Sequence, residues 1–198
     1  MNIQILTSFP YPEGKATANR IRVMSEVLLE SKKIDQIEIL SCSTKSYKEF
    51  LYSSKIKVKN INNTEVDKNK LIKRAINELI LAFRVWSHVE NDSNNIVILT
   101  VPSALFLFPF ILFPNKNFLA LDIRDAVWTY ISDGIINRIF SGILKALFRI
   151  AAKKSDIVSV TNSIEAIELK RISGAESVVI ANGISYEKFE SLKKIPIR

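Results

Sequence analysis

Three charged residues lie within four positions near the middle of the chain, where Asp122, Arg124 and Asp125 interrupt the segment LDIRDAVW. Charged groups at the end of an apolar strand are costly to desolvate and seldom serve packing. One of the carboxylates could orient a substrate hydroxyl or act as a base. Alternatively, both carboxylates could pair with Arg124 and only fix the conformation of the loop. The sequence leaves both interpretations open.

A second candidate segment is the loop at positions 8–15, which contains FPYPEGK. Gly14 would allow a ligand to approach the backbone, and Lys15 adds positive charge. A helix expected to begin at about Ala18 would offer free N–H groups to an anion. An ordinary turn between a strand and a helix explains the same residues equally well. The loop matches neither G-x-G-x-x-G nor a Walker motif, so the usual dinucleotide and ATP fingerprints are absent.

A third segment, VIANGIS, follows the last apolar run of the chain. Asn182 and Gly183 form a turn signal there. From the residues themselves, a plain turn is the better interpretation.

These loops must be positioned by the elements between them. Apolar runs predict strands at 3–6, 36–41, 54–60, 95–100, 117–123, 156–161 and 177–180. Helical spacing predicts helices after a Thr17 cap and at 70–89, 102–113, 133–154 and 163–171. The alternation of apolar and basic residues in 54–60 indicates an edge or solvent-facing strand. The whole pattern predicts an α/β, Rossmann-like parallel sheet with helices on both faces, formed by residues 1–198 as a single domain.

Composition limits the partners and the sites. The chain has 198 residues, 47% of them hydrophobic, and a formal net charge of +8, which favours anionic partners. The single cysteine, Cys42, excludes an internal disulfide, and with only one histidine, His88, a structural zinc site is not expected. The apolar segment 101–113 contains Pro102 and Pro109 and is too short to span a bilayer. A strand pattern at the very start predicts that there is no signal peptide.

Two predicted helices, 133–154 and 102–113, are unusually apolar. In the first, Ile136, Ile139, Phe140, Ile143, Leu147 and Ile150 fall on one side and basic residues on the other. Such a helix could meet an anionic membrane, or it could be a core helix with a solvated basic face. The sequence slightly favours the core helix.

Taken together, the motifs FPYPEGKATANR, LDIRDAVW, SDIVSVTNS and VIANGIS resemble, in this order, the N-terminal, acceptor-side domain of family-4 glycosyltransferases with the GT-B fold. The resemblance covers nearly the whole chain and depends on the order of motifs that are individually unspecific. Two positions depart from the family pattern: the usual double glycine is Gly14-Lys15, and the proline before Asn-Gly is Ala181.

The resemblance implies roles for particular residues. Gly14, Lys15 and Arg20 would face the donor diphosphate, and Asp122, Arg124 and Asp125 would carry the catalytic chemistry. Tyr11, Glu13 and Trp128 would lie on the acceptor side, whereas Asn182 and Gly183 mark the end of the domain. No metal and no cofactor are expected, because the sugar nucleotide is a substrate.

The implied function is the acceptor-binding half of a retaining, sugar-nucleotide-dependent glycosyltransferase of hexosyltransferase type, acting in cell-surface polysaccharide or glycolipid synthesis. The donor-binding domain is expected to be absent, so the chain should need a donor-domain partner for activity. A sugar or a lipid-linked acceptor would be the second substrate. The expected location is the cytoplasm, with peripheral contact at the inner face of an anionic membrane left open. The alternatives are a non-catalytic GT-B-like module that binds a partner or a membrane, and an α/β enzyme of another class. Nucleic acid is not expected as a partner, because the basic residues are dispersed.

Overall fold

The computed structural model describes residues 1–12, 16–43, 49–63, 71–101, 103–129 and 134–181. The strands are β1 (Asn2–Leu6), β2 (Gln36–Ser43), β3 (Glu49–Ser53), β4 (Ile56–Asn62), β5 (Ile96–Val101), β6 (Phe118–Ile123), β7 (Ile157–Val160) and β8 (Val178–Val179). The helices are α1 (Ala16–Leu29), α2 (Leu71–Trp86), α3 (Leu107–Leu112), α4 (Ile135–Lys154) and α5 (Ser163–Ser173), with 3-10 turns η1 (Ala104–Phe106) and η2 (Val127–Thr129).

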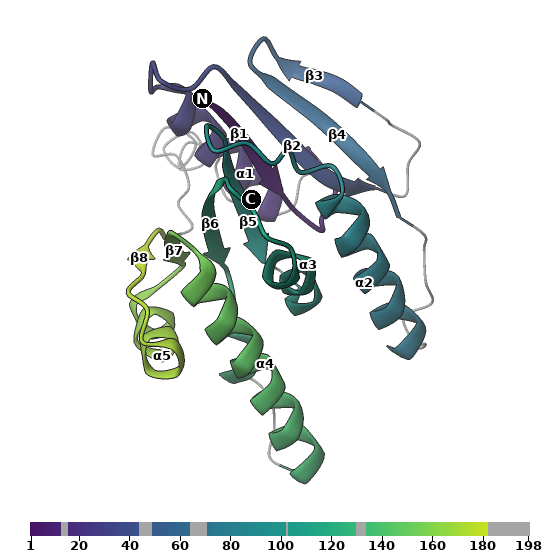
Figure 1. The fold of residues 1–198 in the computed structure, drawn as a ribbon, viewed down its shortest axis with the longest axis vertical. Coiled ribbons are helices and arrows are strands. Elements are labelled where there is room, and N and C mark those ends of the chain that lie inside the picture. Colours follow the sequence, from purple (N-terminus) through teal and green to yellow (C-terminus); the bar gives the residue numbers. More distant parts are fainter. Residues whose placement is uncertain (13–15, 44–48, 64–70, 102, 130–133, 182–198) are drawn as a thin grey trace, which may run out of the picture.

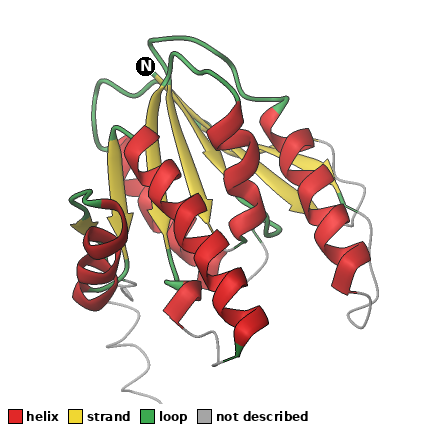
Figure 2. Cartoon of the chain, turned by 60° about the horizontal axis from the view of Figure 1, so that its bottom comes forward, coloured by secondary structure: helices red, strands yellow, loops and turns green. Residues whose placement is uncertain are grey.

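These strands form one sheet in the order β3-β4-β2-β1-β5-β6-β7-β8 (Figure 1). Every neighbouring pair is parallel except β3 and β4, which are antiparallel. The predicted α/β class is therefore confirmed. From β1 the chain adds β2, β3 and β4 on one side, and after β4 it crosses back to add β5, β6, β7 and β8 on the other side. The helix α1 lies on one face of the sheet, and α2, α3, α4 and α5 lie on the other (Figures 1 and 2).

The core is divided by the sheet into two clusters. The larger cluster lies beneath α2, α3, α4 and α5 and includes the buried rings of Trp86, Phe106, Phe110, Trp128 and Phe148. The smaller cluster lies beneath α1 and is built mainly from isoleucines of β1 and β2. Parallel strands are normally covered on both faces, and here the central strands are apolar on both.

The strand β3 was missed by the sequence analysis. It pairs only with β4 and is largely exposed, with Leu51 at 70% exposure, so it adds little apolar periodicity to the sequence. The sequence analysis predicted that residues 54–60 form an edge or solvent-facing strand, and the presence of β3 corrects this prediction. The corresponding strand β4 lies inside the sheet between β2 and β3, and Val58 on it is fully buried.

Two helix starts also differ from the sequence prediction. Thr17 was expected to cap the first helix, but α1 already begins at Ala16 and Thr17 is buried within its first turn. The apolar segment expected as one helix from Pro102 is divided into η1 and the short helix α3. Pro102 itself lies outside the described residues.

Four residues of the apolar stripe predicted on α4 are exposed, which corrects the favoured interpretation for them, whereas Leu147 of the same stripe is partly buried against the core. Ile139, Phe140, Ile143 and Ile150 are all about half exposed or more, whereas Leu144, Phe148, Ala151 and Ala152 pack beneath the helix. The helix has two apolar arcs, and the sheet covers only one of them.

Cys42 provides a test of packing at the carboxyl end of β2. Its side chain is 1% exposed and its thiol donates to the Thr7 carbonyl oxygen at 3.4 Å. Burial raises the pKa of the Cys42 thiol to about 12, so at pH 8 the group is protonated as well as inaccessible. We expect no reaction of the native protein with Ellman's reagent at pH 8, and one equivalent of thiol after unfolding in guanidinium chloride. Rapid stoichiometric reaction of the native protein would contradict this packing.

Candidate functional site

The candidate site lies where β6 and β7 end and α1 begins. At the carboxyl edge of a parallel sheet, side chains from distant segments meet, and ligands of such folds bind there. Asp122 belongs to β6, Arg20 to α1 and Ser159 to β7. The three side chains are joined in one hydrogen-bonded cluster, described next.

Arg20 and Asp122 form a buried ion pair. The Arg20 Nη2 atom lies 2.7 Å from Asp122 Oδ1, and its Nε donates to Oδ2 at 3.0 Å. Their side chains are only 7% and 2% exposed. Ser159 Oγ donates to Asp122 Oδ1 at 2.7 Å, and Arg20 Nη1 donates to the Ile180 carbonyl oxygen at 2.8 Å. The pair thus connects α1, β6, β7 and the segment that follows β8.

Arg124 is held by a different partner from the one that the sequence suggested. Its Nη1 donates to the Thr17 hydroxyl in the first turn of α1, and its carbonyl oxygen accepts from Thr161 Oγ1 at 3.2 Å. Within the described ranges no ion pair joins Arg124 to Asp122 or Asp125. The alternative interpretation of the sequence, in which both carboxylates pair with Arg124, is therefore wrong. The Arg124 Nε atom is buried without a hydrogen-bond partner in the described part of the chain.

Asp125 is the exposed charged residue of this loop. Its carbonyl oxygen accepts from the backbone N–H of Val127 at 2.8 Å, which fixes its backbone. Its carboxylate has no hydrogen bond to another described residue. Of the three charged residues predicted to be catalytic, Asp125 is the one whose carboxylate faces solvent.

Glu165 holds the loop and was not singled out from the sequence. It is 6% exposed, and its carboxylate accepts from the Ala126 N–H at 3.2 Å and from Thr161 Oγ1 at 2.6 Å. The backbone N–H of Glu165 donates to Asn162 Oδ1 at 3.0 Å, and the Glu165 carboxylate also accepts from the Thr161 N–H at 3.1 Å. An Asn followed by Glu three residues later at a helix start is a capping signal, and it could have identified Glu165.

Two of the predicted acceptor-side residues are buried in the core. Trp128 is 3% exposed and lies 4.6 Å from the ring of Phe148, while Tyr11 is 3% exposed and contacts Tyr52 edge-on at 5.4 Å. The Trp128 Nε1 and Tyr11 Oη atoms have no hydrogen-bond partner among the described residues. Burial, and then the neighbouring Tyr52, raise the pKa of Tyr11 well above its usual value. Their acceptor-side role stays a prediction.

The remaining predicted residues, Glu13, Gly14, Lys15, Asn182 and Gly183, lie outside the described residues. In the part that is described, no group of three or more His, Cys, Asp or Glu side chains could hold a metal ion. A search of the same residues finds no helix with the length and apolar character that a membrane crossing requires.

An apolar groove of about 590 Å³ begins at the ion pair and runs along α1. Arg20, Ser159 and Ala181 line it near the candidate site, and Val27, Phe118 and Ile157 line its distant part. The groove follows the face of β5, β6, β7 and β8 that α1 leaves uncovered. It gives the candidate site an apolar extension on the α1 side.

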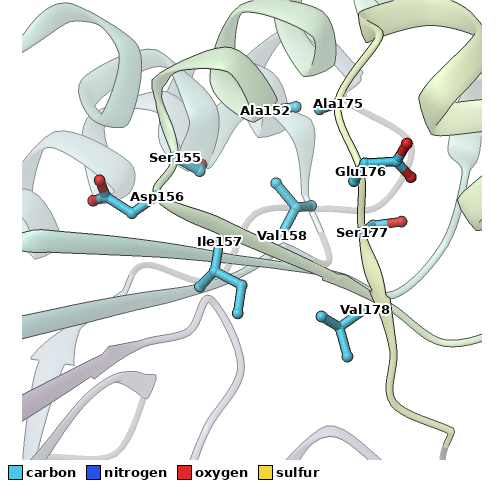
Figure 3. Close-up of a pocket in the computed structure, with 9 residues that line it drawn as sticks. All are labelled: Ala152, Ser155, Asp156, Ile157, Val158, Ala175, Glu176, Ser177 and Val178. Carbon is cyan, nitrogen blue, oxygen red and sulfur yellow. The ribbon is translucent and has the colours of Figure 1, made fainter.

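A second hollow, of about 440 Å³, lies where β7 and β8 begin, at the edge opposite the ion pair (Figure 3). Its two acids already have partners. Asp156 Oδ2 accepts from the Leu119 N–H at 2.7 Å, and Glu176 pairs with Lys170 at 2.5 Å. The hollow therefore offers no uncompensated charge to a ligand.

Solved structures of sugar-phosphate synthases share this fold. Sucrose-phosphate synthase from Thermosynechococcus elongatus matches 99% of this chain and 53% of its own chain, with a TM-score of 0.66 and 12% identity. Another structure of that protein matches 98% of this chain and 95% of its own, with a TM-score of 0.61 and 11% identity. Trehalose-6-phosphate synthase from E. coli, bound with UDP-2-fluoro glucose, matches 100% of this chain and 52% of its own chain, with a TM-score of 0.64 and 7% identity.

These neighbours are glycosyltransferases with the GT-B fold, and the likeness shows that this chain has the Rossmann-like fold of a GT-B domain. The chain spans about half the length of two of the three matched chains. No protein-family model and no curated protein sequence matches it.

The buried ion pair can be tested by a double-mutant cycle. Arg20→Met leaves the Asp122 charge buried without its main partner, so we expect a loss of about 3–5 kcal/mol in the free energy of unfolding. The same range is expected for Asp122→Ala, which leaves the Arg20 charge buried without its carboxylate partner. The double variant should lose much less than the sum of the two, as measured by urea denaturation.

The matched control is the exposed pair of Arg171 and Glu168 on α5, with 60% and 27% side-chain exposure. Replacing these residues with glutamine, singly and together, should give a coupling energy close to zero. Equal coupling in the two cycles would contradict the structural importance of the buried pair.

Proposed function

We propose that this chain is the acceptor-binding half of a retaining, sugar-nucleotide-dependent glycosyltransferase of the family-4 type, acting in cell-surface polysaccharide or glycolipid synthesis. The observation that carries the proposal is Asp125, an exposed carboxylate on a loop fixed from three sides at the carboxyl edge of a GT-B domain. The fold likeness and the order of the sequence motifs support the same assignment.

The loop is fixed before any substrate binds. Thr17 holds the Arg124 guanidinium, Thr161 holds the Arg124 carbonyl, and Glu165 holds the Ala126 N–H. Much of enzymatic rate enhancement comes from such pre-arranged geometry, because the reacting groups need no reorganisation. In this proposal Asp125 orients an acceptor hydroxyl or accepts its proton, and Arg124 supplies positive charge beside it.

Asp122 has a different role in this proposal. Its carboxylate accepts hydrogen bonds from Arg20 and Ser159 and is almost inaccessible to solvent. It is therefore a positioning residue that keeps the Arg20 guanidinium oriented. Arg20, at the end of the groove along α1, in turn contributes positive potential toward a donor diphosphate bound across the cleft.

The sugar-nucleotide donor requires a second half. Two of the matched glycosyltransferases are about twice as long as the region they share with this chain. We infer that a donor-binding domain, on the same polypeptide or on a partner chain, completes the site in the cytoplasm. No metal or cofactor is part of the proposal.

We expect the 198-residue chain by itself to transfer no sugar, because the donor is not held over the acceptor. The test is a radiometric assay with UDP- and GDP-sugars and oligosaccharide or lipid-linked acceptors, in the absence and in the presence of a matching donor-binding domain. Transfer only in the mixture would support the proposal. Turnover by the chain without that domain would overturn the requirement for a second half.

Binding of the acceptor can be tested without turnover. We expect Asp125→Asn to weaken acceptor binding about tenfold or more, because the carboxylate accepts the hydroxyl hydrogen bond more strongly than an amide. Saturation-transfer NMR with a panel of oligosaccharides would measure the change. Glu30→Gln, another exposed acid located at the end of α1, is the control and should bind normally. Unchanged binding in Asp125→Asn would contradict the assignment of Asp125 to the acceptor site, and it would not affect the assignment of the fold.

The second candidate function is a non-catalytic GT-B-like module that binds a partner or a membrane. The exposed apolar arc of α4 favours it, since an enzyme half needs no such surface for chemistry. Failure of every donor-binding domain to restore transfer, together with retained surface binding, would favour this second function.

A further inference from the structure

The groove along α1 has an apolar floor and an apolar wall. Its floor is the face of the sheet formed by β5, β6, β7 and β8, and its wall is one side of α1. The wall extends from Ala16 to Leu28, which corresponds to about 18 Å along the helix axis. Between these ends it is formed mainly by Val23, Met24 and Val27. An extended hydrocarbon chain can therefore lie along the whole wall.

The floor of the groove changes from apolar to polar along β6. Because side chains alternate along a strand, Phe118, Ala120 and Asp122 lie on the same face. Phe118 is 45% exposed, whereas Asp122 is 1% exposed and accepts hydrogen bonds from Arg20. Ala120 lies between them and has a single methyl group, which leaves room in the middle of the floor. The groove is thus apolar where the strands begin and polar where they end.

The lining of the groove is nearly uncharged. Among the described residues that form it, Arg20 is the charged one, and Asp122 compensates its charge at 2.7 Å. The volume of about 590 Å³ falls within the range of roughly 300–1,000 Å³ that is usual for small-molecule sites, which are mostly apolar with a few polar groups. These properties suit an uncharged hydrocarbon chain that carries a polar group at one end.

We propose that this groove binds the hydrocarbon chain of a lipid-linked acceptor, whose sugar lies at the carboxyl edge of the sheet. The strand β6 connects the two parts, because Phe118 and Ala120 belong to the floor and the loop with the exposed Asp125 follows Ile123 directly. A chain in the groove would therefore direct its sugar toward that loop. This inference rests on the proposed function, since it names the class of acceptor that the same site would take.

The test is isothermal titration calorimetry of the 198-residue protein with alkyl glucosides below their critical micelle concentrations. We expect binding to become about threefold tighter for each methylene added from octyl to decyl glucoside, because each methylene buries apolar surface. Glucose, which has no chain, should bind at least tenfold more weakly than decyl glucoside. Sodium decanoate should also bind at least tenfold more weakly, because it has no sugar and its carboxylate would approach that of Asp125.

Variants of the groove locate the binding. Ala120→Phe should fill the middle of the floor and weaken the binding of decyl glucoside at least tenfold. Because a larger side chain could disturb folding, a second variant combines Val23→Ser with Val27→Ser, at wall positions that are 41% and 58% exposed. It should weaken binding several-fold. The matched control combines Ile139→Ser with Ile143→Ser on α4, where the side chains are 62% and 51% exposed, and should bind like the unaltered protein.

The two methionines of the chain give an independent readout. Met24 lines the groove, whereas Met1 precedes β1. In protein labelled with ¹³C in its methionine methyl groups, decyl glucoside should shift the NMR resonance of Met24 and leave that of Met1 in place.

The inference is overturned if the Met24 resonance does not shift, if groove and control variants lose binding equally, or if decanoate binds as tightly as decyl glucoside. A stable dimer in light scattering that the Val23 and Val27 changes dissociate would also overturn it, because a second copy would then cover the groove. These results leave the proposed function standing. That function fails instead if Asp125→Asn binds oligosaccharides normally, whatever the chain-length dependence.

Discussion

The ion pair between Arg20 and Asp122 is the interaction on which the carboxyl edge of this domain depends. Burying two charges costs several kcal/mol for each ion, and only close geometry with additional hydrogen bonds offsets that cost. Here Ser159 and the Ile180 carbonyl supply those bonds. Breaking one member would leave an uncompensated charge at the junction of α1, β6 and β7. The pair therefore fixes α1 against the sheet at the place where ligands of such folds bind.

Above this pair, a second layer of hydrogen bonds holds the loop after β6. Thr17, Thr161 and Glu165 come from α1, the end of β7 and the first turn of α5, respectively. Each contacts a different atom or residue of the loop, so the loop cannot shift without breaking several bonds together. This arrangement leaves the Asp125 carboxylate facing solvent, and a rigid support for an exposed polar group is typical of binding and catalytic sites.

The two faces of the sheet are covered unequally. Among the described residues, α2, α3, α4 and α5 lie on one face, whereas α1 is the only helix on the other. As a result, the strands from β5 to β8 present apolar residues to the groove along α1, with Phe118 at 45% and Ile157 at 43% exposure. On the opposite side, the helices themselves carry exposed isoleucines. The domain thus has an apolar groove on one face and exposed isoleucines on the helices of the other face, in addition to its polar edge.

The sequence by itself determined the class of the fold and the position of most elements, because strand and helix periodicities are local and alternate along the chain. It also marked Asp122, Arg124 and Asp125 as unusual. Only the tertiary structure decided their partners, since Asp122 meets Arg20 across 102 positions and Arg124 meets Thr17 across 107. The edge strand β3 escaped prediction because its pairing with β4 rests on backbone hydrogen bonds and little burial. In the same way, α4 carries apolar residues on more than one side, and a helical pattern cannot say which side meets a sheet. Packing against β6, α3 and α5 made that choice and left the other arc exposed.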